Sequence, residues 1–122
     1  VVVQRHAIPA AFMMWAMILP ASADTGEEID HLLAFVDSSG CTYVRNGKEY
    51  NPAEAREHIE RKYDYIRDRI STTEQFIRYA ATESSISGKP YTVICGGQEE
   101  PSADWLQREL ARYRAVPPGQ RR

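Results

Sequence analysis

The sequence has little of three things that mark common protein classes: excess positive charge, long apolar runs and closely spaced cysteines. Its 15 Lys and Arg stand against 17 Asp and Glu, for a formal net charge of −2. Nucleic-acid-binding domains usually present a strongly basic face, so the charge argues against that class. A membrane-spanning helix needs about 20 consecutive apolar residues, and the uncharged apolar run over residues 10–19 is half that length. With 43% hydrophobic and 26% charged residues, the composition is that of a small globular protein.

The first 23 residues have the three-part pattern of a secretory signal peptide. Arg5 is their only strong charge, residues 10–19 form the apolar run, and Ala21-Ser22-Ala23 places small residues before a cleavage site at Asp24. A membrane anchor is the alternative, and the shortness of the run argues against it. We therefore predict a cleaved signal over residues 1–23 and a periplasmic or secreted bacterial protein, with no membrane span after cleavage.

Cys41 and Cys95 are the two cysteines of the chain. In an exported protein a disulfide is the first interpretation. A redox pair usually has the spacing Cys-x-x-Cys, and His31 and His58 lack zinc-ligand spacing from either cysteine. Free thiols and a metal site are the weaker alternatives, and we expect no metal or other cofactor. On chain-entropy arithmetic, closing this loop contributes about 4 kcal/mol, whereas a whole domain is stable by about 5–15 kcal/mol.

Hydrophobic periodicity and turn residues predict an α+β fold, mainly helical, with about four helices and a small antiparallel sheet of two or three strands. The helices are expected over residues 26–38, 52–70, 71–82 and 103–114. Asn46-Gly47 predicts a type I′ hairpin turn within residues 41–50, and residues 91–95 have the composition of a strand. We expect a single domain over residues 24–116 and a disordered tail over residues 117–122.

Three of these helices begin at residues with capping chemistry. Asn51 is expected to cap the second helix, with Glu54 completing a capping box. Ser71 and Glu74 have the same spacing and predict the start of the third helix. Ser102 is expected to cap the last helix.

The connection between the third helix and the following strand is the best candidate binding site. Loops held between regular elements often carry binding groups, and backbone N–H groups near Ser87-Gly88, with Lys89, suit a carboxylate or phosphate. A purely structural role is the alternative, because turn chemistry also explains these residues. Glu83 and Pro90 occupy positions that a nucleotide P-loop requires for Gly and Ser/Thr, which excludes that motif. The candidate set is Ser84, Ser85, Ser87, Gly88, Lys89, Tyr91 and Trp105.

A serine hydrolase is the enzymatic alternative, although the sequence contains no Gly-x-Ser-x-Gly elbow. Catalysis would need a Ser hydroxyl, a His base and an orienting carboxylate within hydrogen-bond reach of one another. The residues available as base and orienting acid are His31, His58, Asp37, Asp64 and Asp104.

Tyrosines and basic residues offer a second surface. Tyr combines apolar area with a polar tip, so these side chains either cluster in the core or line a shallow groove. The tyrosines in question are Tyr63, Tyr65, Tyr79, Tyr91 and Tyr113. Arg61, Lys62, Arg67 and Arg69 form an edge that attracts anions, but acidic residues alternate with them, which favours ordinary i,i+4 pairing.

Several short motifs, taken together, resemble one protein family. They are Gly40-Cys41-Thr42, Arg45-Asn46-Gly47, Tyr50, Ala53-Glu54-Ala55, Lys62-Tyr63, Ala80, Ser84 to Tyr91, and Pro101 to Leu106. The set resembles a family of small bacterial periplasmic proteins known as domain of unknown function 5329, over about Glu28 to Tyr113. The resemblance implies a secreted or periplasmic single domain, and it brings no activity, cofactor or catalytic residue.

Together these features predict a non-enzymatic periplasmic domain that binds a protein, a peptide or a cell-envelope component. The alternative is a small hydrolase acting on envelope material. Nucleic acid is not expected as a partner.

Overall fold

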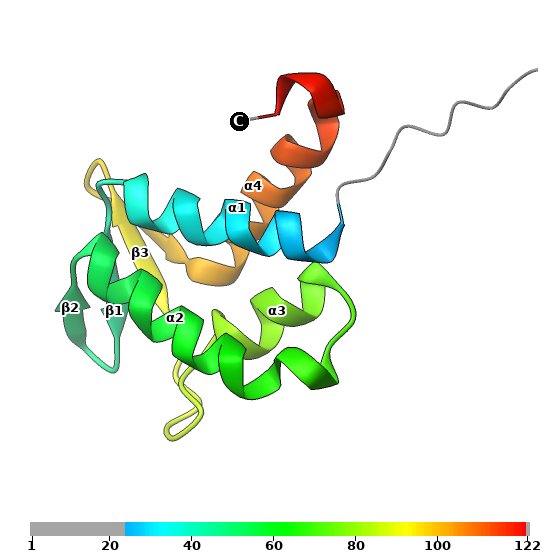
Figure 1. Ribbon diagram of the computed structural model, residues 1–122. Helices are drawn as coiled ribbons and strands as arrows, with labels where there is room; N and C mark the ends of the chain where they lie inside the picture. The colour runs from blue at the N-terminus through cyan, green and yellow to red at the C-terminus, as the bar shows by residue number, and fades with distance from the viewer. Residues whose placement is uncertain (1–23, 122) are drawn as a thin grey trace, which may run out of the picture.

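A computed structural model describes residues 24–121 (Figure 1). The predicted signal peptide over residues 1–23 lies outside the described residues. The helices are α1 (Thr25–Ser38), α2 (Pro52–Ile66), α3 (Thr73–Ala80) and α4 (Ser102–Ala115), with 3₁₀ turns at Arg67–Arg69 and Pro118–Gln120. The strands are β1 (Thr42–Arg45), β2 (Lys48–Tyr50), β3 (Thr92–Cys95) and β4 (Gln98–Pro101). The α+β class, mainly helical with a small antiparallel sheet, is confirmed.

The strands form one antiparallel sheet in the order β2-β1-β3-β4, built from two hairpins. Asn46 and Gly47 turn the first hairpin with φ of 51° and 75°, as the type I′ interpretation predicts. Gly96 and Gly97 turn the second with φ of 56° and 79°. The sheet thus has four strands, whereas two or three were predicted. Gln98–Pro101 contains two Glu and a Pro, which have low strand propensity, yet it pairs with β3 at the sheet edge.

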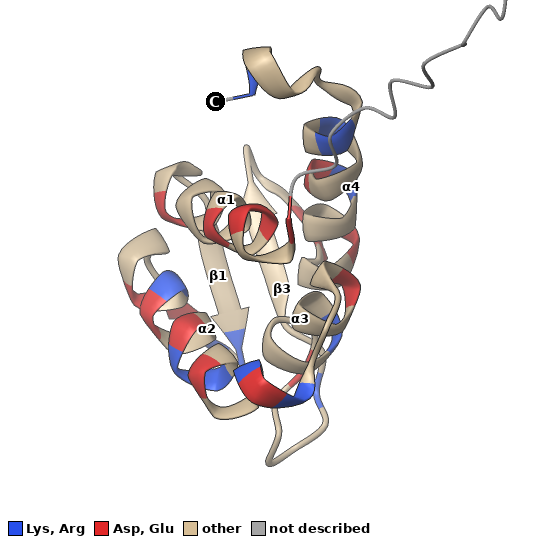
Figure 2. Ribbon diagram, turned by 45° about the vertical axis from the view of Figure 1, so that its right-hand side comes forward, with Lys and Arg blue, Asp and Glu red and all other residues tan. Residues whose placement is uncertain are grey.

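The helices and the sheet share one core. Helix α2 packs on β1, α4 packs on β3 and β4, and α1 lies among α2, α3 and α4 (Figures 1 and 2). Tyr43 and Val93 are directly paired across β1 and β3, and both are buried, so they present one face of the sheet to the helices. The apolar stripe predicted for the first helix is the buried side of α1 and consists of Ile29, Leu32, Leu33 and Val36.

The predicted disulfide is present. Cys41 and Cys95 are bonded, with their Cα atoms 4.7 Å apart. Cys41 immediately precedes β1 and Cys95 ends β3, and the ladder between those strands sets Thr42 opposite Ile94. The bond therefore links neighbouring strands at the end of their ladder and closes a loop containing α2 and α3.

Helix boundaries follow the predicted capping chemistry in one case of three. Asn51 accepts from the backbone N–H of Glu54 in a complete capping box, as predicted. Helix α3 is capped by Thr72 with Gln75, one residue later than the Ser71 box, because the Gln75 side chain accepts from the Thr72 N–H at 3.1 Å. The predicted second helix also ends early, at Ile66, where the 3₁₀ turn begins.

Ser102 does not cap α4, contrary to the prediction. It is the first residue of the helix and is fully buried, and its Oγ lies 2.5 Å from the Tyr43 hydroxyl. The N-cap position is Pro101, which makes no side-chain cap. The Ser102 hydroxyl therefore forms a tertiary hydrogen bond to β1, and it does not cap the start of α4 as the sequence pattern predicts.

A buried ionic cluster joins three helices. Glu28 of α1 is 5% exposed and accepts from Arg114 of α4 through both carboxylate oxygens, at 2.7 and 2.9 Å. Thr73 of α3 donates to the same carboxylate at 2.6 Å, and Arg114 also pairs with Glu74. The Arg114 guanidinium holds the pKa of the Glu28 carboxyl below its ordinary value, although burial opposes it.

The segment predicted as a disordered tail contains structure up to Arg121. Pro118–Gln120 form a 3₁₀ turn. The Arg121 guanidinium donates to the carbonyls of Tyr113 and Val116 at 3.2 and 3.0 Å, and it lies 5.0 Å from the centre of the Tyr113 ring. The turn is thereby tied to the end of α4.

Candidate functional site

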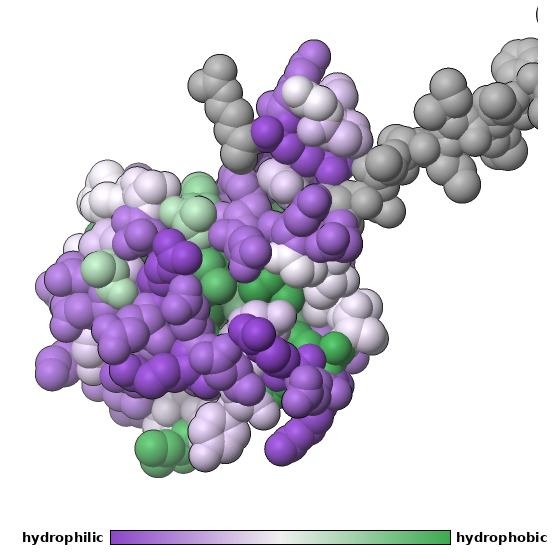
Figure 3. All heavy atoms as spheres, in the orientation of Figure 1, coloured by the Kyte–Doolittle hydropathy of each residue, from purple (hydrophilic) through white to green (hydrophobic). Residues whose placement is uncertain are grey.

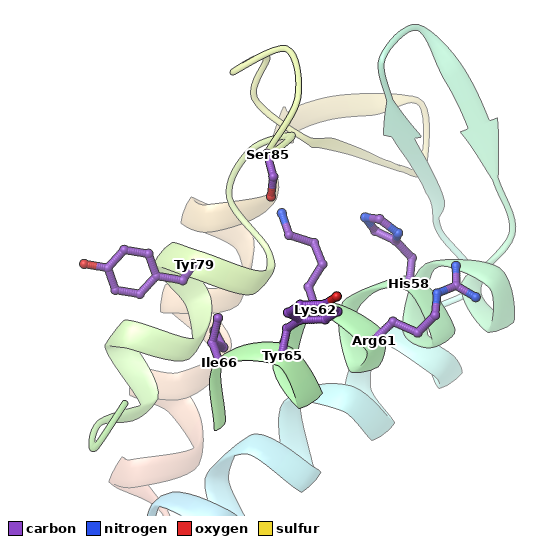
Figure 4. A pocket seen from close by; sticks show the side chains of 7 residues that line it. All are labelled: His58, Arg61, Lys62, Tyr65, Ile66, Tyr79 and Ser85. Atoms are coloured by element: carbon purple, nitrogen blue, oxygen red, sulfur yellow. The ribbon is translucent and has the colours of Figure 1, made fainter. Parts of the chain in front are cut away.

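A groove lies between α2, α3 and the loop that precedes β3 (Figure 4). It has a volume of about 450 Å³. Figure 4 shows Lys62 reaching from α2 toward Ser85 in the loop, with His58 and Arg61 on one side and Ile66 and Tyr79 on the other. The lining residues are His58, Arg61, Lys62, Tyr65, Ile66, Tyr79 and Ser85.

Helical spacing explains why α2 forms most of this lining. His58, Arg61, Lys62, Tyr65 and Ile66 stand at intervals of three, four, seven and eight residues from the first, and such positions share one side of a helix. The two fully buried positions of α2, at residues 55 and 59, lie on the side that Lys62 and Ile66 continue, three and seven residues after Ile59. His58, Arg61 and Tyr65 flank that side, so the groove lies along the edge of the buried face of α2.

The conformation of the loop is fixed by hydrogen bonds within it. The Ser84 N–H donates to the Lys89 carbonyl at 3.0 Å, and the Gly88 N–H donates to the Ser84 carbonyl at 2.9 Å. The Ser84 hydroxyl accepts from the N–H groups of Ile86 and Ser87 at 3.3 and 3.2 Å. Gly88 adopts φ of 71°, which favours glycine. These contacts match the structural interpretation for Ser84 and Gly88.

The other loop residues of the candidate set differ in their surroundings. The Ser87 hydroxyl donates to the Asn46 side chain at 2.5 Å, which fastens the loop to the first hairpin. Lys89 is exposed, and Ser85 lines the groove. Among the loop serines, Ser85 is thus the one that faces the groove.

The side chains of Tyr91 and Trp105 are buried and not exposed on the surface. The Tyr91 side chain is 1% exposed, and its ring centre lies 5.8 Å from that of Tyr43. Trp105 is 6% exposed and packs at 4.7 Å against Phe35 of α1. The structure therefore does not bring Trp105 to the loop, and Tyr91 contributes only its hydroxyl to the polar cluster below the groove.

A polar cluster connects the groove to the sheet. The Lys62 ammonium donates to the Tyr91 hydroxyl at 3.1 Å and to the Glu83 carbonyl at 2.8 Å. The same hydroxyl lies 3.1 Å from Nε2 of His58, and the Arg45 guanidinium lies 2.7 Å from Nδ1. Burial and then the charge of Arg45 lower the pKa of Lys62, against the effect of Glu83. The cluster thus combines two cations, an imidazole and a phenol.

The imidazole of His58 is expected to stay neutral at pH 7. Burial lowers its pKa from 6.5 to about 4, and Arg45, Lys62 and Arg61 act in the same direction. In the unfolded chain His58 is protonated at a higher pH than in the folded protein. The free energy of unfolding therefore decreases as the pH falls from about 6.5 to about 4. An NMR titration of the ring protons measures this pKa directly.

The same titration in two variants tests the cause of the lowered pKa. In Arg45→Met the pKa of His58 rises, because a neighbouring positive charge is removed. In Arg108→Met, on α4, it stays unchanged. A His58 pKa at or above the ordinary 6.5 contradicts the buried, cation-flanked environment.

A second lobe extends the groove along α3. It has a volume of about 290 Å³ and shares Ile66 and Tyr79 with the first lobe. Figure 3 shows mostly hydrophilic residues over the outer face of α2, with apolar residues between the helices and at the tip of the loop. The lining residues of the second lobe are Ile66, Arg69, Ile70, Gln75 and Tyr79.

Large apolar side chains are unusually exposed around the first lobe. Tyr65 is 84% exposed, Tyr79 is 49% exposed, and Ile86 at the loop tip is 98% exposed. The groove interpretation of the tyrosines is therefore correct for Tyr65 and Tyr79, whereas Tyr91 and Tyr113 are buried. Ile66 lines both lobes, and its spacing of seven residues from Ile59 matches the apolar periodicity of the buried side of α2.

The basic residues of α2 and of the 3₁₀ turn that follows it show the predicted i,i+4 pairing only in part. Arg61 pairs with Glu57 four residues before it, at 3.0 Å, whereas Arg67 pairs with Asp64 three residues before it, at 2.9 Å. Within residues 24–121, neither Lys62 nor Arg69 makes an ion pair with a carboxylate. Figure 2 shows Lys, Arg, Asp and Glu side by side along α2.

Several of the residues considered for hydrolysis make contacts with residues other than a serine. His31 lies 2.7 Å from Glu109 and stacks on Tyr113 at 4.0 Å between ring centres. Asp37 pairs with Arg56. In the described part of the chain, no hydrogen bond joins either His31 or His58 to a Ser hydroxyl.

Two further features are absent from residues 24–121. No group of three or more His, Cys, Asp or Glu side chains there is placed to hold a metal ion. No helix of that part of the chain has the length and apolar character needed to cross a membrane.

Comparison with known proteins places the chain among uncharacterised relatives. A family model described as "Family of unknown function (DUF5329)" matches residues 23–114. The Salmonella typhimurium protein named "Uncharacterized protein YfeK" is 42% identical over 89 residues, which is 69% of this chain and 74% of that protein. No solved structure matches the chain.

Proposed function

This chain belongs to the DUF5329 family of unknown function, and we propose that it is a non-enzymatic binding domain that acts outside the cytoplasm. Its binding surface is the groove between α2, α3 and the loop before β3. The partner is a protein, a peptide or another component of the cell envelope. Contact with the partner covers the exposed tyrosines that line this groove.

The exposure of Tyr65 beside Lys62 carries the proposal. A tyrosine that is 84% exposed next to a concave surface leaves apolar area in water. Tyr and Arg are enriched where proteins contact partners, because they offer both contact area and polar groups. Here Tyr65, Tyr79 and Arg61 border one groove of about 450 Å³. The arrangement suits a ligand that covers the tyrosines and approaches the cations.

Two features support a location outside the cytoplasm. The Cys41–Cys95 disulfide is stable in oxidising compartments and rare in the reducing cytosol. The sequence of residues 1–23 has the pattern of a secretory signal peptide. Both features support a periplasmic location, and the Salmonella relative is a bacterial protein.

A small hydrolase is the alternative, and one observation favours it. Ser85 lines the same groove as Lys62, whose pKa is lowered by burial. A lysine with a lowered pKa is able to activate a serine hydroxyl. In the structure, however, the Lys62 ammonium donates to the Tyr91 hydroxyl and the Glu83 carbonyl. If the protein hydrolyses esters and a folded Ser85→Ala variant loses this activity, the hydrolase is favoured over the binding domain.

Site-specific photo-crosslinking in an exporting bacterial cell tests the proposal. A photoreactive benzoyl-phenylalanine replaces Tyr65 in the full chain, because that side chain is exposed and its replacement leaves the core intact. We expect an adduct in the periplasmic fraction that disappears when Arg61→Glu is added. The groove arginine is 64% exposed, so its charge reversal leaves the fold unchanged.

A matched control separates groove contacts from random collisions. The same photoreactive residue at Gln107, exposed on α4, should form no such adduct. Equal adducts from both positions, an adduct indifferent to Arg61→Glu, or a chain retained in the cytoplasm each contradict the proposal.

A further inference from the structure

The groove has a charge opposite to that of the chain around it. Residues 24–122 contain 14 Lys and Arg against 17 Asp and Glu, a net charge of −3. None of the described residues that line the two lobes is acidic, whereas Arg61, Lys62 and Arg69 are among them. The carboxylates of Glu57 and Glu83 lie nearby, since they pair with Arg61 and raise the pKa of Lys62 respectively. The lining itself is cationic and apolar.

The two lobes meet at an apolar divide. Ile66 and Tyr79 line both lobes, with Arg61 and Lys62 in the first and Arg69 in the second. Tyr65 flanks the first lobe with its ring in solvent. A ligand that follows both lobes thus meets positive charge, an apolar surface and positive charge again. A linear chain with alternating carboxylates and an apolar side chain has the complementary order.

We propose that the groove binds an acidic peptide segment of a partner protein, with an aromatic side chain between Tyr65 and Tyr79 and flanking carboxylates at Arg61, Lys62 and Arg69. This inference rests on the proposed function and specifies the chemistry of its partner. Arg and Lys pair with carboxylates through charge-assisted hydrogen bonds, and clusters of such cations are a recurrent means of recognising acidic motifs. The exposed Tyr rings supply stacking area for one aromatic residue.

The net charge favours a short peptide over a larger anionic surface. A membrane or a nucleic acid presents negative charge over an area wider than the groove, so it also meets acidic residues around the lining of a chain that is net negative. A short peptide in the groove meets only charges within about 8–10 Å, the screening length at physiological salt. The three cations of the lining, Arg61, Lys62 and Arg69, outnumber the carboxylates of Glu57 and Glu83 beside it.

Fluorescence anisotropy with synthetic peptides tests the inference on the disulfide-bonded protein. The probes are end-capped, labelled peptide pools in which one Phe is flanked by Glu and by random small residues. Two matched pools replace Glu with Gln or Phe with Ser. We expect the Glu/Phe pool to bind at least about tenfold more tightly than either matched pool, and to weaken as salt rises.

Exposed variants of the groove assign the binding to its lining. Arg61→Glu and Tyr65→Ser should each weaken binding of the Glu/Phe pool by about tenfold. The matched controls Arg108→Glu and Gln107→Ser, both exposed on α4, should change it less than about twofold, because neither residue lines either lobe. Circular dichroism of each variant verifies the fold.

Three outcomes overturn the inference. The Glu and Gln pools bind equally, the control variants weaken binding as much as the groove variants, or phosphatidylglycerol vesicles bind the protein with the same groove dependence while the peptides do not. If the peptides fail while the photo-crosslink at Tyr65 persists, the groove binds a partner of different chemistry. If the crosslink fails as well, the proposed function fails with the inference.

Discussion

Opening the Cys41–Cys95 disulfide is expected to lower the free energy of unfolding by about 4 kcal/mol, because the unfolded chain regains the freedom of a loop of about 54 residues. That is a large share of the roughly 5–15 kcal/mol by which a domain is normally stable. For a domain of this size the loss corresponds to a fall in Tm of roughly 15–30 °C. Thermal unfolding with and without a thiol reductant, followed by circular dichroism, measures the difference.

The paired variant Cys41→Ser/Cys95→Ser separates the bond from the reductant. It should unfold like the reduced protein, and added reductant should leave its Tm unchanged. If the reduced protein and the paired variant both keep the Tm of the oxidised protein, the bond is not a major source of stability. If alkylation finds both thiols free in native material, the bond itself is refuted.

Replacing Arg114 by Met is expected to cost about 2 kcal/mol of unfolding free energy. The substitution leaves the Glu28 carboxylate, which is 5% exposed, with Thr73 as its remaining donor. Breaking a fully buried ion pair costs about 3–5 kcal/mol. The smaller figure applies here because the Arg114 side chain is 44% exposed and partly solvated. Urea unfolding at pH 7 measures the loss.

A pH series gives the same variant a second test. The lowered pKa of Glu28 contributes stability above its ordinary value of 4.5, and that contribution disappears as the pH falls through the folded-state pKa. In Arg114→Met the pKa of Glu28 rises, so the fall in stability at acid pH becomes shallower. The control Arg108→Met removes an exposed partner of Glu100 and should cost less than about 1 kcal/mol. Equal losses in both variants would contradict a special role for the buried pair.

Elements governed by local chemistry are predictable from the sequence. Asn51 and Glu54 form their reciprocal bonds within one helical turn, and the Asn46-Gly47 turn depends on the positive φ that those two residues tolerate. Gln98–Pro101 lacks strand propensity, and it becomes β4 because the Gly96-Gly97 turn folds it onto the free edge of β3. This strand is stabilised by its pairing with β3, and the local sequence pattern gives no sign of that pairing.

The role of the Ser102 hydroxyl was likewise not predictable from the local sequence. Its position before the last helix suits a cap, and the short bond to the Tyr43 hydroxyl across the core takes precedence. The choice between the two roles depends on where β1 lies relative to α4. That arrangement is set by packing over the whole domain.

One residue of the candidate site predicted from the sequence, Ser85, lies in the lining of the groove. The sequence places a site at the loop before β3, and Ser85 from that loop does line the groove. It does not show that Tyr91 points its ring into the core, that Trp105 packs against α1, or that His58, Lys62 and Tyr65 of α2 line a groove with the loop. Those facts depend on how α2 and α3 pack together, which residue types alone do not specify.

Amide chemical shifts of the protein, recorded during titration with the Glu/Phe peptide pool, test most directly whether the groove is the binding surface. We expect the largest shifts in residues 58–70, 75–79 and 83–86, which include the lining of the two lobes and the adjacent loop. A separate hollow, lined by Phe35, Trp105, Arg108, Glu109 and Arg112, should stay unperturbed. Shifts that concentrate in that hollow, with no shifts in the groove, would show that the groove is not the binding surface.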